Sequence, residues 1–354
     1  MIITRGEKIV TPVELVDKYD SENFLTWLEQ FPDQVEQAAE LGQEVKSLRS
    51  NCDSIYIGGM GGSGIAGDLV ASFLYDQFKV PVTALRYYDL PAAVDEKSLF
   101  VGVSYSGNTE ETLALFREAG LRGAKRLAIT SGGELGRIAG DSQTGLIEIP
   151  AGQPPRASAP YLFLPLIYCL AASGYAESPA PEALEETLVE LRQLTSKLAP
   201  ATGSNPAYAL AKKIHDRYNL LYGSQPITAP LALRLKNQLN ENAKMLAVAN
   251  EFPELNHNEI MGWRQLGEVE DKWHAIFLRD PAEHPRVEKR FEITREILAE
   301  SVGGIDELSG SGESRLSRFL TLMLYTDYVS YYCALLRGED PSEINSIERL
   351  KEKL

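Results

Sequence analysis

The stretch Tyr56–Val70, YIGGMGGSGIAGDLV, is a short apolar run that passes through a glycine-rich turn into a segment of helical character. Glycine lets the backbone approach an anion closely, and the amides at a helix N-terminus face that anion with the positive end of the helix dipole. A strand that enters a helix in this way is typical of parallel α/β sheets. The stretch therefore predicts an α/β fold with a phosphate-binding turn.

The first half of the chain continues this alternation of strands and helices. Helices are expected within 13–48, ahead of the sheet, and an apolar helix follows the Pro154-Pro155 turn and ends near Ala172. In between, the pattern predicts strands at 54–57, 82–85, 99–103, 126–130 and 145–149, and helices at 62–78 and 109–119. Strands separated by helices imply a parallel sheet covered on both faces.

The second half repeats the theme. The pattern predicts a strand at 219–224 that ends in Gly-Ser, a helix at 229–249, a strand at 274–278 and a long amphipathic helix at 319–336. Because both halves contain a strand that runs through Gly-Ser into a helix, we expect an internal duplication. The Ser-Pro-Ala-Pro stretch at 178–181 is the expected linker, which divides the chain into domains 1–178 and 179–354.

Three kinds of phosphate ligand compete for the glycine-rich turn. Residues 59–64 (GMGGSG) satisfy the G-x-G-x-x-G pattern of dinucleotide sites. No Gly-Lys-Ser/Thr follows, which excludes the triphosphate-binding loop. A dinucleotide site expects an acidic residue at the end of the second strand, where this chain has Leu85-Arg86. Arg86 still fits the 2′-phosphate of NADP, so an NADP-dependent oxidoreductase stays open as an alternative.

A second polar turn favours a compact phosphate group. The sequence SYSGNTEET at 104–112 follows the third expected strand and presents the hydroxyls of Ser104, Ser106 and Thr109, of which Thr109 also fits a helix N-cap. Turns that follow neighbouring parallel strands meet at one edge of the sheet. Both turns would therefore close on one small phosphate and not on an extended pyrophosphate.

The bulk properties exclude several classes of function. A formal net charge of -15 argues against a nucleic-acid partner. The three scattered cysteines fit reduced thiols in a cytoplasmic protein, and the four histidines lie too far apart for a local metal motif, so no metal site is expected. The charged first eight residues predict no signal peptide, and the most apolar stretch, 161–172, is too short to cross a membrane.

Three further stretches supply groups for acid–base chemistry. Residues 235–242 (LKNQLNEN) place Glu241 among amides, and residues 254–259 (ELNHNE) place His257 in a polar turn. Arg156 comes just after the fifth expected strand, at the carboxyl edge where parallel sheets bind ligands. On spacing alone, Glu241 also fits a solvated helix face, His257 a surface position and Arg156 a surface ion pair.

Taken together, these motifs resemble the sugar isomerase (SIS) superfamily of phosphosugar-binding proteins. Within it the chain resembles the bifunctional phosphoglucose/phosphomannose isomerase family, on both turns, Pro155-Arg156 and the stretches at 240–242, 256–258 and 347–351. The resemblance implies two SIS-type domains, each a parallel sheet flanked by helices in a flavodoxin-like three-layer sandwich. It implies a sugar 6-phosphate substrate, and an enzyme without metal or cofactor that interconverts glucose 6-phosphate and fructose 6-phosphate, and also mannose 6-phosphate, through a cis-enediol(ate).

The resemblance also implies roles for individual residues. Glu241 would carry the proton between C1 and C2, and Arg156 would steady the enediolate. His257 would open the sugar ring, and in the family it reaches the site from the partner subunit of a homodimer. Lys351 would assist ring opening. The phosphate would be held by hydroxyls and backbone amides of the two turns, namely those of Gly61, Gly62, Ser63, Ser104, Ser106 and Thr109.

Two alternatives lie within the same superfamily. One is a non-catalytic phosphosugar-binding protein, although no segment of the sequence suggests the DNA-binding helices that such regulators usually carry. The other is a different sugar-phosphate isomerase, such as the isomerase half of glucosamine-6-phosphate synthase, whose glutaminase domain is not expected ahead of this first sheet.

Overall fold

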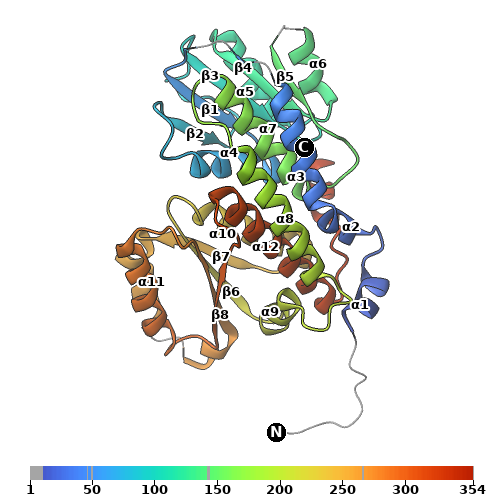
Figure 1. Cartoon of the computed structure of the whole chain (residues 1–354), viewed down its shortest axis with the longest axis vertical. Helices are drawn as coiled ribbons and strands as arrows, with labels where there is room; N and C mark the ends of the chain where they lie inside the picture. Colours follow the sequence, from blue (N-terminus) through green and yellow to red (C-terminus); the bar gives the residue numbers. More distant parts are fainter. Residues whose placement is uncertain (1–10, 46, 49–50, 142–143, 265–266, 354) are drawn as a thin grey trace.

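The computed structural model describes residues 11–45, 47–48, 51–141, 144–264 and 267–353. The first eight residues, on which the prediction about a signal peptide rests, lie outside these ranges. Two parallel β-sheets form the centre of the two halves, and helices α10 and α12 lie between them (Figure 1). Among the described residues, no helix is both long enough and apolar enough to cross a membrane.

The first sheet has the strand order β2-β1-β3-β4-β5, and all its strands are parallel. This is the flavodoxin-like order. Its strands are β1 (Ser54–Gly58), β2 (Val82–Leu85), β3 (Ser98–Val103), β4 (Lys125–Thr130) and β5 (Gly145–Glu148). Every residue of β3 is buried, as expected for a central strand covered by helices on both faces.

The second sheet has the order β7-β6-β8-β9, again all parallel. It repeats the first four positions of the first sheet, which agrees with the predicted internal duplication. Its strands are β6 (Tyr218–Ser224), β7 (Ala247–Phe252), β8 (Trp273–Arg279) and β9 (Ile305–Ser309). The predicted α/β fold with two parallel sheets is therefore confirmed.

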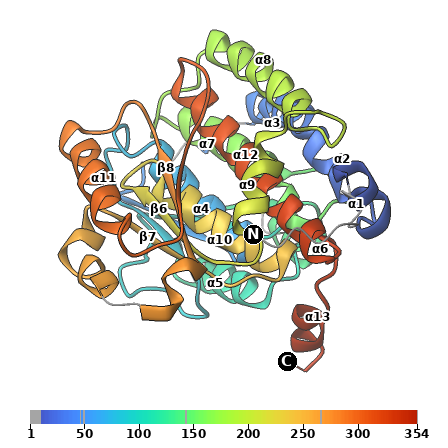
Figure 2. The same cartoon turned by 90° about the horizontal axis from the view of Figure 1, so that it is seen from below.

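The helices cover the sheets and fill the space between them (Figures 1 and 2). Those of the first half are α1 (Pro12–Tyr19), α2 (Phe24–Glu29), α3 (Phe31–Glu44), α4 (Gly61–Phe73), α5 (Glu110–Leu121), α6 (Gly133–Asp141) and α7 (Ala159–Ala172). Those that follow are α8 (Pro181–Leu198), α9 (Pro206–Ile214), α10 (Ala229–Ala243), α11 (Pro285–Leu298), α12 (Arg315–Arg337) and α13 (Asn345–Lys351). Short 3₁₀ turns are η1 (Pro155–Ala157), η2 (Glu254–His257), η3 (Glu259–Arg264) and η4 (Gly267–Lys272).

Two predicted helices end earlier than the sequence pattern indicated. Helix α4 stops at Phe73, short of the expected 78. Helix α10 stops at Ala243, because Lys244 takes the left-handed conformation with φ of 53°. The chain then enters β7, so the prediction of a helix through 249 is wrong.

The stretch predicted as a linker, 178–181, leads directly into α8. This helix packs against α3 of the first half and α12 of the second. A bridging helix at this point leaves the boundary between 178 and 179 a prediction.

A buried histidine at the start of β8 makes the stability of the second sheet depend on pH. His274 is 2 % exposed, and its Nε2 atom lies 2.8 Å from Asp306 Oδ2. Burial lowers the pKa of His274, although Asp306 opposes this effect. The folded protein therefore takes up the proton at a lower pH than the unfolded chain, so stability is lost as pH falls below the ordinary histidine pKa of about 6.5.

We expect this loss to be smaller in a His274→Gln variant. The free energy of unfolding, measured with urea at about pH 7.5 and about pH 5.5, should fall less between the two conditions than it does in the wild type. His257→Gln is the matched control, because that side chain is exposed. An equal pH dependence in wild type and His274→Gln would show that His274 is not the group responsible.

Candidate active site

The glycine-rich turn connects β1 to α4 at the carboxyl edge of the first sheet. Gly61 opens α4 with a positive φ of 52° and borders open space. Gly62 lies so close to η1 that an added Cβ atom would stand 3.0 Å from the Pro155 carbonyl. Because the first turn of a helix has no intrahelical acceptors for its amides, those of Gly61 and Gly62 can donate to an anion.

The second polar turn lies directly beside the first. Ser63 Oγ accepts a hydrogen bond of 3.0 Å from the amide of Tyr105, which joins the two turns. Ser104 is fully buried, and its Oγ atom lies 2.9 Å from Thr109 Oγ1. Thr109 occupies the predicted N-cap position of α5, but its hydroxyl pairs with Ser104 and does not cap the helix. The exposed Ser106 Oγ accepts from the amide of Asn108 at 3.3 Å.

Arg156 is held in η1 just behind the glycine-rich turn. Its side chain is 4 % exposed, so it is not the surface residue that spacing alone allowed. The guanidinium donates to Asn242 Oδ1 at 2.7 Å through Nε and to the Pro341 carbonyl at 2.6 Å through Nη2. It also lies over the ring of Phe24, 5.1 Å from its centroid. Burial lowers the pKa of Arg156, and the nearby carboxylate of Glu241 opposes this effect.

Glu241 reaches the same place from the last turn of α10. Its Oε2 atom lies 3.9 Å from Arg156 Nη1, and its side chain is 24 % exposed. The neighbouring Asn240 donates to the carbonyl of Met245 and does not orient the carboxylate. The structure thus places a partly open carboxylate beside the buried guanidinium of Arg156, whose backbone adjoins the glycine-rich turn.

Antiparallel packing of α4 and α10 creates this arrangement. At one end Ser72, near the C-terminus of α4, donates to the carbonyl of Ile227 just before α10 at 3.3 Å. At the other end, the first turn of α4 meets Arg156, which binds Asn242 near the C-terminus of α10. The site therefore combines the N-terminal end of a helix from one half with the C-terminal end of a helix from the other.

The matching turn of the second half, after β6, is held by hydrogen bonds between its own residues. The amide of Ser224 donates to Thr228 Oγ1 at 2.7 Å, and the two hydroxyls lie 3.2 Å apart. The Thr228 side chain thus binds back to the last residue of β6 and does not cap α10. The two halves therefore share a strand order but differ in the residues of this turn.

His257 and Lys351 do not join this cluster within one chain. His257 ends η2, is exposed, and has no hydrogen bond to the other predicted site residues in the described part of the chain. Lys351 is the exposed last residue of α13, a short helix that projects from the body of the molecule (Figure 2).

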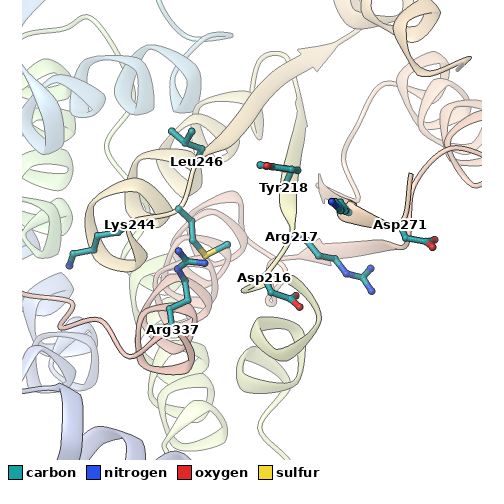
Figure 3. Close-up of a pocket in the computed structure, with 9 residues that line it drawn as sticks. Asp216, Arg217, Tyr218, Lys244, Leu246, Asp271 and Arg337 are labelled. Carbon is teal, nitrogen blue, oxygen red and sulfur yellow. The ribbon is translucent and has the colours of Figure 1, made fainter. Parts of the chain in front are cut away.

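An open hollow of about 650 Å³ lies at the amino edge of the second sheet (Figure 3). Two of the cations that line it, Lys244 and Arg217, point in different directions. The Lys244 amine donates to the carbonyl of Asn242 at 3.1 Å, and burial lowers its pKa.

Comparison with known proteins identifies the family. The chain is 38% identical over 327 residues to the bifunctional phosphoglucose/phosphomannose isomerase of Caldicellulosiruptor bescii. The aligned region covers 91% of this chain and 96% of that enzyme. The chain belongs to the bifunctional phosphoglucose/phosphomannose isomerase family. The enzyme of that name from Aquifex aeolicus is also 38% identical, over 84% of this chain and 88% of its own length.

Family models and solved structures agree with this membership. The SIS domain model matches residues 49–148, and the model of the bacterial phospho-glucose isomerase C-terminal SIS domain matches residues 203–354. The C-terminal domain of glucosamine-fructose-6-phosphate aminotransferase from Francisella tularensis has a TM-score of 0.70 at 16% identity, covering 90% of this chain and 98% of its own. At that identity the likeness concerns the fold alone. The predicted membership of the phosphoglucose/phosphomannose isomerase family is confirmed.

Several contacts of the site were not predicted from the sequence. They are the backbone of Pro341 and Ser342, the ring of Phe24, and the side chains of Asn242, Arg234, Gln238 and Asp327. Asn242 was visible as part of a polar stretch, but its partner lies 86 residues earlier. No local pattern indicates a contact of that kind.

Proposed function

We propose that the protein interconverts glucose 6-phosphate and fructose 6-phosphate, and mannose 6-phosphate with the same ketose, without metal or cofactor. The observation that carries this proposal is the Glu241 carboxylate, 3.9 Å from the guanidinium of Arg156, whose backbone adjoins the glycine-rich turn. Glu241 takes a proton from one of the carbons C1 and C2 and returns it to the other. Arg156 stabilises the negative charge that develops on the enediolate.

The same intermediate accounts for two aldose substrates. Glucose 6-phosphate and mannose 6-phosphate differ at C2, which becomes planar in the enediol. The phosphate is bound by the amides of Gly61 and Gly62 and by the hydroxyls of the two turns, those of Ser63, Ser104, Ser106 and Thr109. Each of these hydroxyls now has a neighbour within the protein, so a bound phosphate would share or replace these hydrogen bonds.

Ring opening is assigned to His257, with assistance from Lys351, in a cytoplasmic homodimer. Both side chains are exposed and stand apart from Glu241 within one chain, which supports a donor from a second subunit. A two-fold dimer would supply each site with the partner's histidine.

Two coupled assays test the proposal. Conversion of fructose 6-phosphate to glucose 6-phosphate is followed in EDTA with a dehydrogenase. The second assay starts from mannose 6-phosphate, with added phosphoglucose isomerase to reveal any fructose 6-phosphate. Turnover in both supports the bifunctional activity, and turnover in the first alone restricts it to a phosphoglucose isomerase. No turnover in either, with sugar phosphate still bound, would leave a non-catalytic phosphosugar-binding protein.

The shared site predicts complementation between two inactive variants. Glu241→Gln and His257→Ala should each be inactive alone. In a mixed dimer one site carries both changes and the other carries neither. Random mixing should therefore restore about a quarter of wild-type activity. Mixing each variant with itself is the control, and no recovery after verified subunit exchange would place the histidine in its own chain's site.

A further inference from the structure

Asn242 follows the proposed base at the end of α10, and its side chain is fully buried. Its Oδ1 atom accepts from Arg156 Nε at 2.7 Å, and its Nδ2 group donates to Ser330 Oγ at 3.0 Å. Ser330 in turn donates to the carbonyl of Asp327 at 2.8 Å. These contacts fix the amide with its oxygen toward the guanidinium.

The way in which Arg156 is held determines what it can offer Glu241. A guanidinium pairs most strongly with a carboxylate through two parallel N–H groups of one edge. Here the edge formed by Nε and Nη2 is occupied by the oxygens of Asn242 and Pro341. Nη1 is the nitrogen without a protein acceptor within hydrogen-bond distance in the described part of the chain. It faces Glu241 at 3.9 Å.

The backbone of Arg156 is fixed as well. Its carbonyl accepts from Arg234 Nη2 at 3.0 Å, and Gln238 Nε2 lies 3.5 Å from it. Both of these residues belong to α10, which also carries Asn242 and Glu241. Residues of α10 thus bind both the side chain and the backbone of Arg156, and the same helix carries the proposed base.

We propose that Asn242 is a positioning residue that prevents Arg156 from forming a two-bond ion pair with Glu241. The carboxylate then stays free to accept a proton, and Nη1 stays free to donate to the enediolate. This inference rests on the proposed function. Without the Asn242 oxygen, the Nε edge of the guanidinium would turn to Glu241 as the nearest acceptor with full charge.

Other charged groups surround the pair and remain in every variant. The negative charges of Glu22, before α2, and of Asp340, in the segment after α12, also act on the Arg156 guanidinium and favour its charged form. Lys244, at the end of α10, acts on it as a cation. Because these groups are unchanged, a difference in pH profile between wild type and an Asn242 variant reports on the Asn242 contact.

Two substitutions should move the pH profile in opposite directions. Asn242→Ala lets Arg156 pair with Glu241, so the acid limb of kcat/KM should move to lower pH by about one unit. Asn242→Asp binds Arg156 itself and adds a negative charge beside Glu241, so the limb should move to higher pH by about one unit. Both variants should lower kcat, and the inhibition constant of inorganic phosphate should change little.

A ligand-binding measurement separates failure of this inference from failure of the proposed function. Calorimetry compares inorganic phosphate with 6-phosphogluconate, whose carboxylate stands at the C1 position. Asn242→Asp should weaken 6-phosphogluconate about tenfold, because it neutralises Arg156, and leave phosphate binding unchanged. Equal weakening of both ligands, or unchanged binding of both, would overturn the inference even in a protein without isomerase turnover.

The near-isosteric Asn242→Asp is the deciding variant if Asn242→Ala does not fold. Asn240→Asp, two residues earlier on α10, is the matched control, since its side chain contacts the Met245 carbonyl and not Arg156. An active wild type combined with an unshifted acid limb in Asn242→Asp would also overturn the positioning role, as would a shift of equal size in Asn240→Asp.

Discussion

Replacement of Glu241 by glutamine should reduce kcat by about 10³-fold, because an amide cannot accept the proton that moves between C1 and C2. The amide has nearly the same shape as the carboxylate. The two turns proposed to bind the phosphate follow β1 and β3 of the first sheet, whereas Glu241 lies on α10, so substrate binding should change little. Coupled assays with both aldose phosphates measure the loss, and competition by inorganic phosphate measures the binding site separately.

The matched control for this prediction is Glu185→Gln, an exposed glutamate on α8 that loses the same charge far from the site. Its activity should equal that of the wild type. If Glu241→Gln keeps more than about a tenth of wild-type kcat, the proton is carried by another group and the proposed base is wrong.

Replacement of Asp327 by alanine should lower the free energy of unfolding by about 3–5 kcal/mol. Asp327 on α12 and Arg234 on α10 form an ion pair of 2.6 Å, with their side chains 1 % and 2 % exposed. Gln238 donates to the same carboxylate at 2.9 Å. Removing the carboxylate leaves a guanidinium buried without its partner, which costs far more than the pair itself contributes.

The double variant Arg234→Met, Asp327→Leu is the control for that effect. It removes both charges and keeps the volume apolar, so it should be much more stable than Asp327→Ala in the same urea titration. Equal destabilisation of the single and double variants would mean that lost packing dominates and not the unpaired charge.

The sequence predicted those parts of the site that are local. The glycine-rich turn and the 104–112 turn each lie within a single strand-to-helix connection, so spacing alone indicated their place at the sheet edge. The end of α10 was missed because Lys244 takes a left-handed conformation usually marked by glycine. The first residues of β7, 247–249, were consequently predicted as the end of a helix.

Contacts between distant segments had no local signal. Asp327 falls within the helix predicted at 319–336, but its partners Arg234 and Gln238 lie on another helix. The Arg156 guanidinium also donates to the backbone carbonyls of Pro341 and Ser342, 185 and 186 residues away. A backbone acceptor can belong to any residue type, so the sequence does not indicate these contacts. Tertiary packing decides these contacts, and single-sequence patterns do not report it.

The difference between the turn after β1 and the turn after β6 has a consequence for the number of ligands that each chain binds. Two copies of one fold would offer two equivalent anion sites in each chain. In the second copy, however, the turn has no glycine-rich opening, and the Thr228 hydroxyl accepts a hydrogen bond of 2.7 Å from the Ser224 amide at the end of β6. Under the proposed function, the first half binds the phosphate of the substrate and the second half contributes the Glu241 carboxylate of α10. We therefore expect each chain to bind one sugar phosphate, and neither half alone to catalyse the reaction.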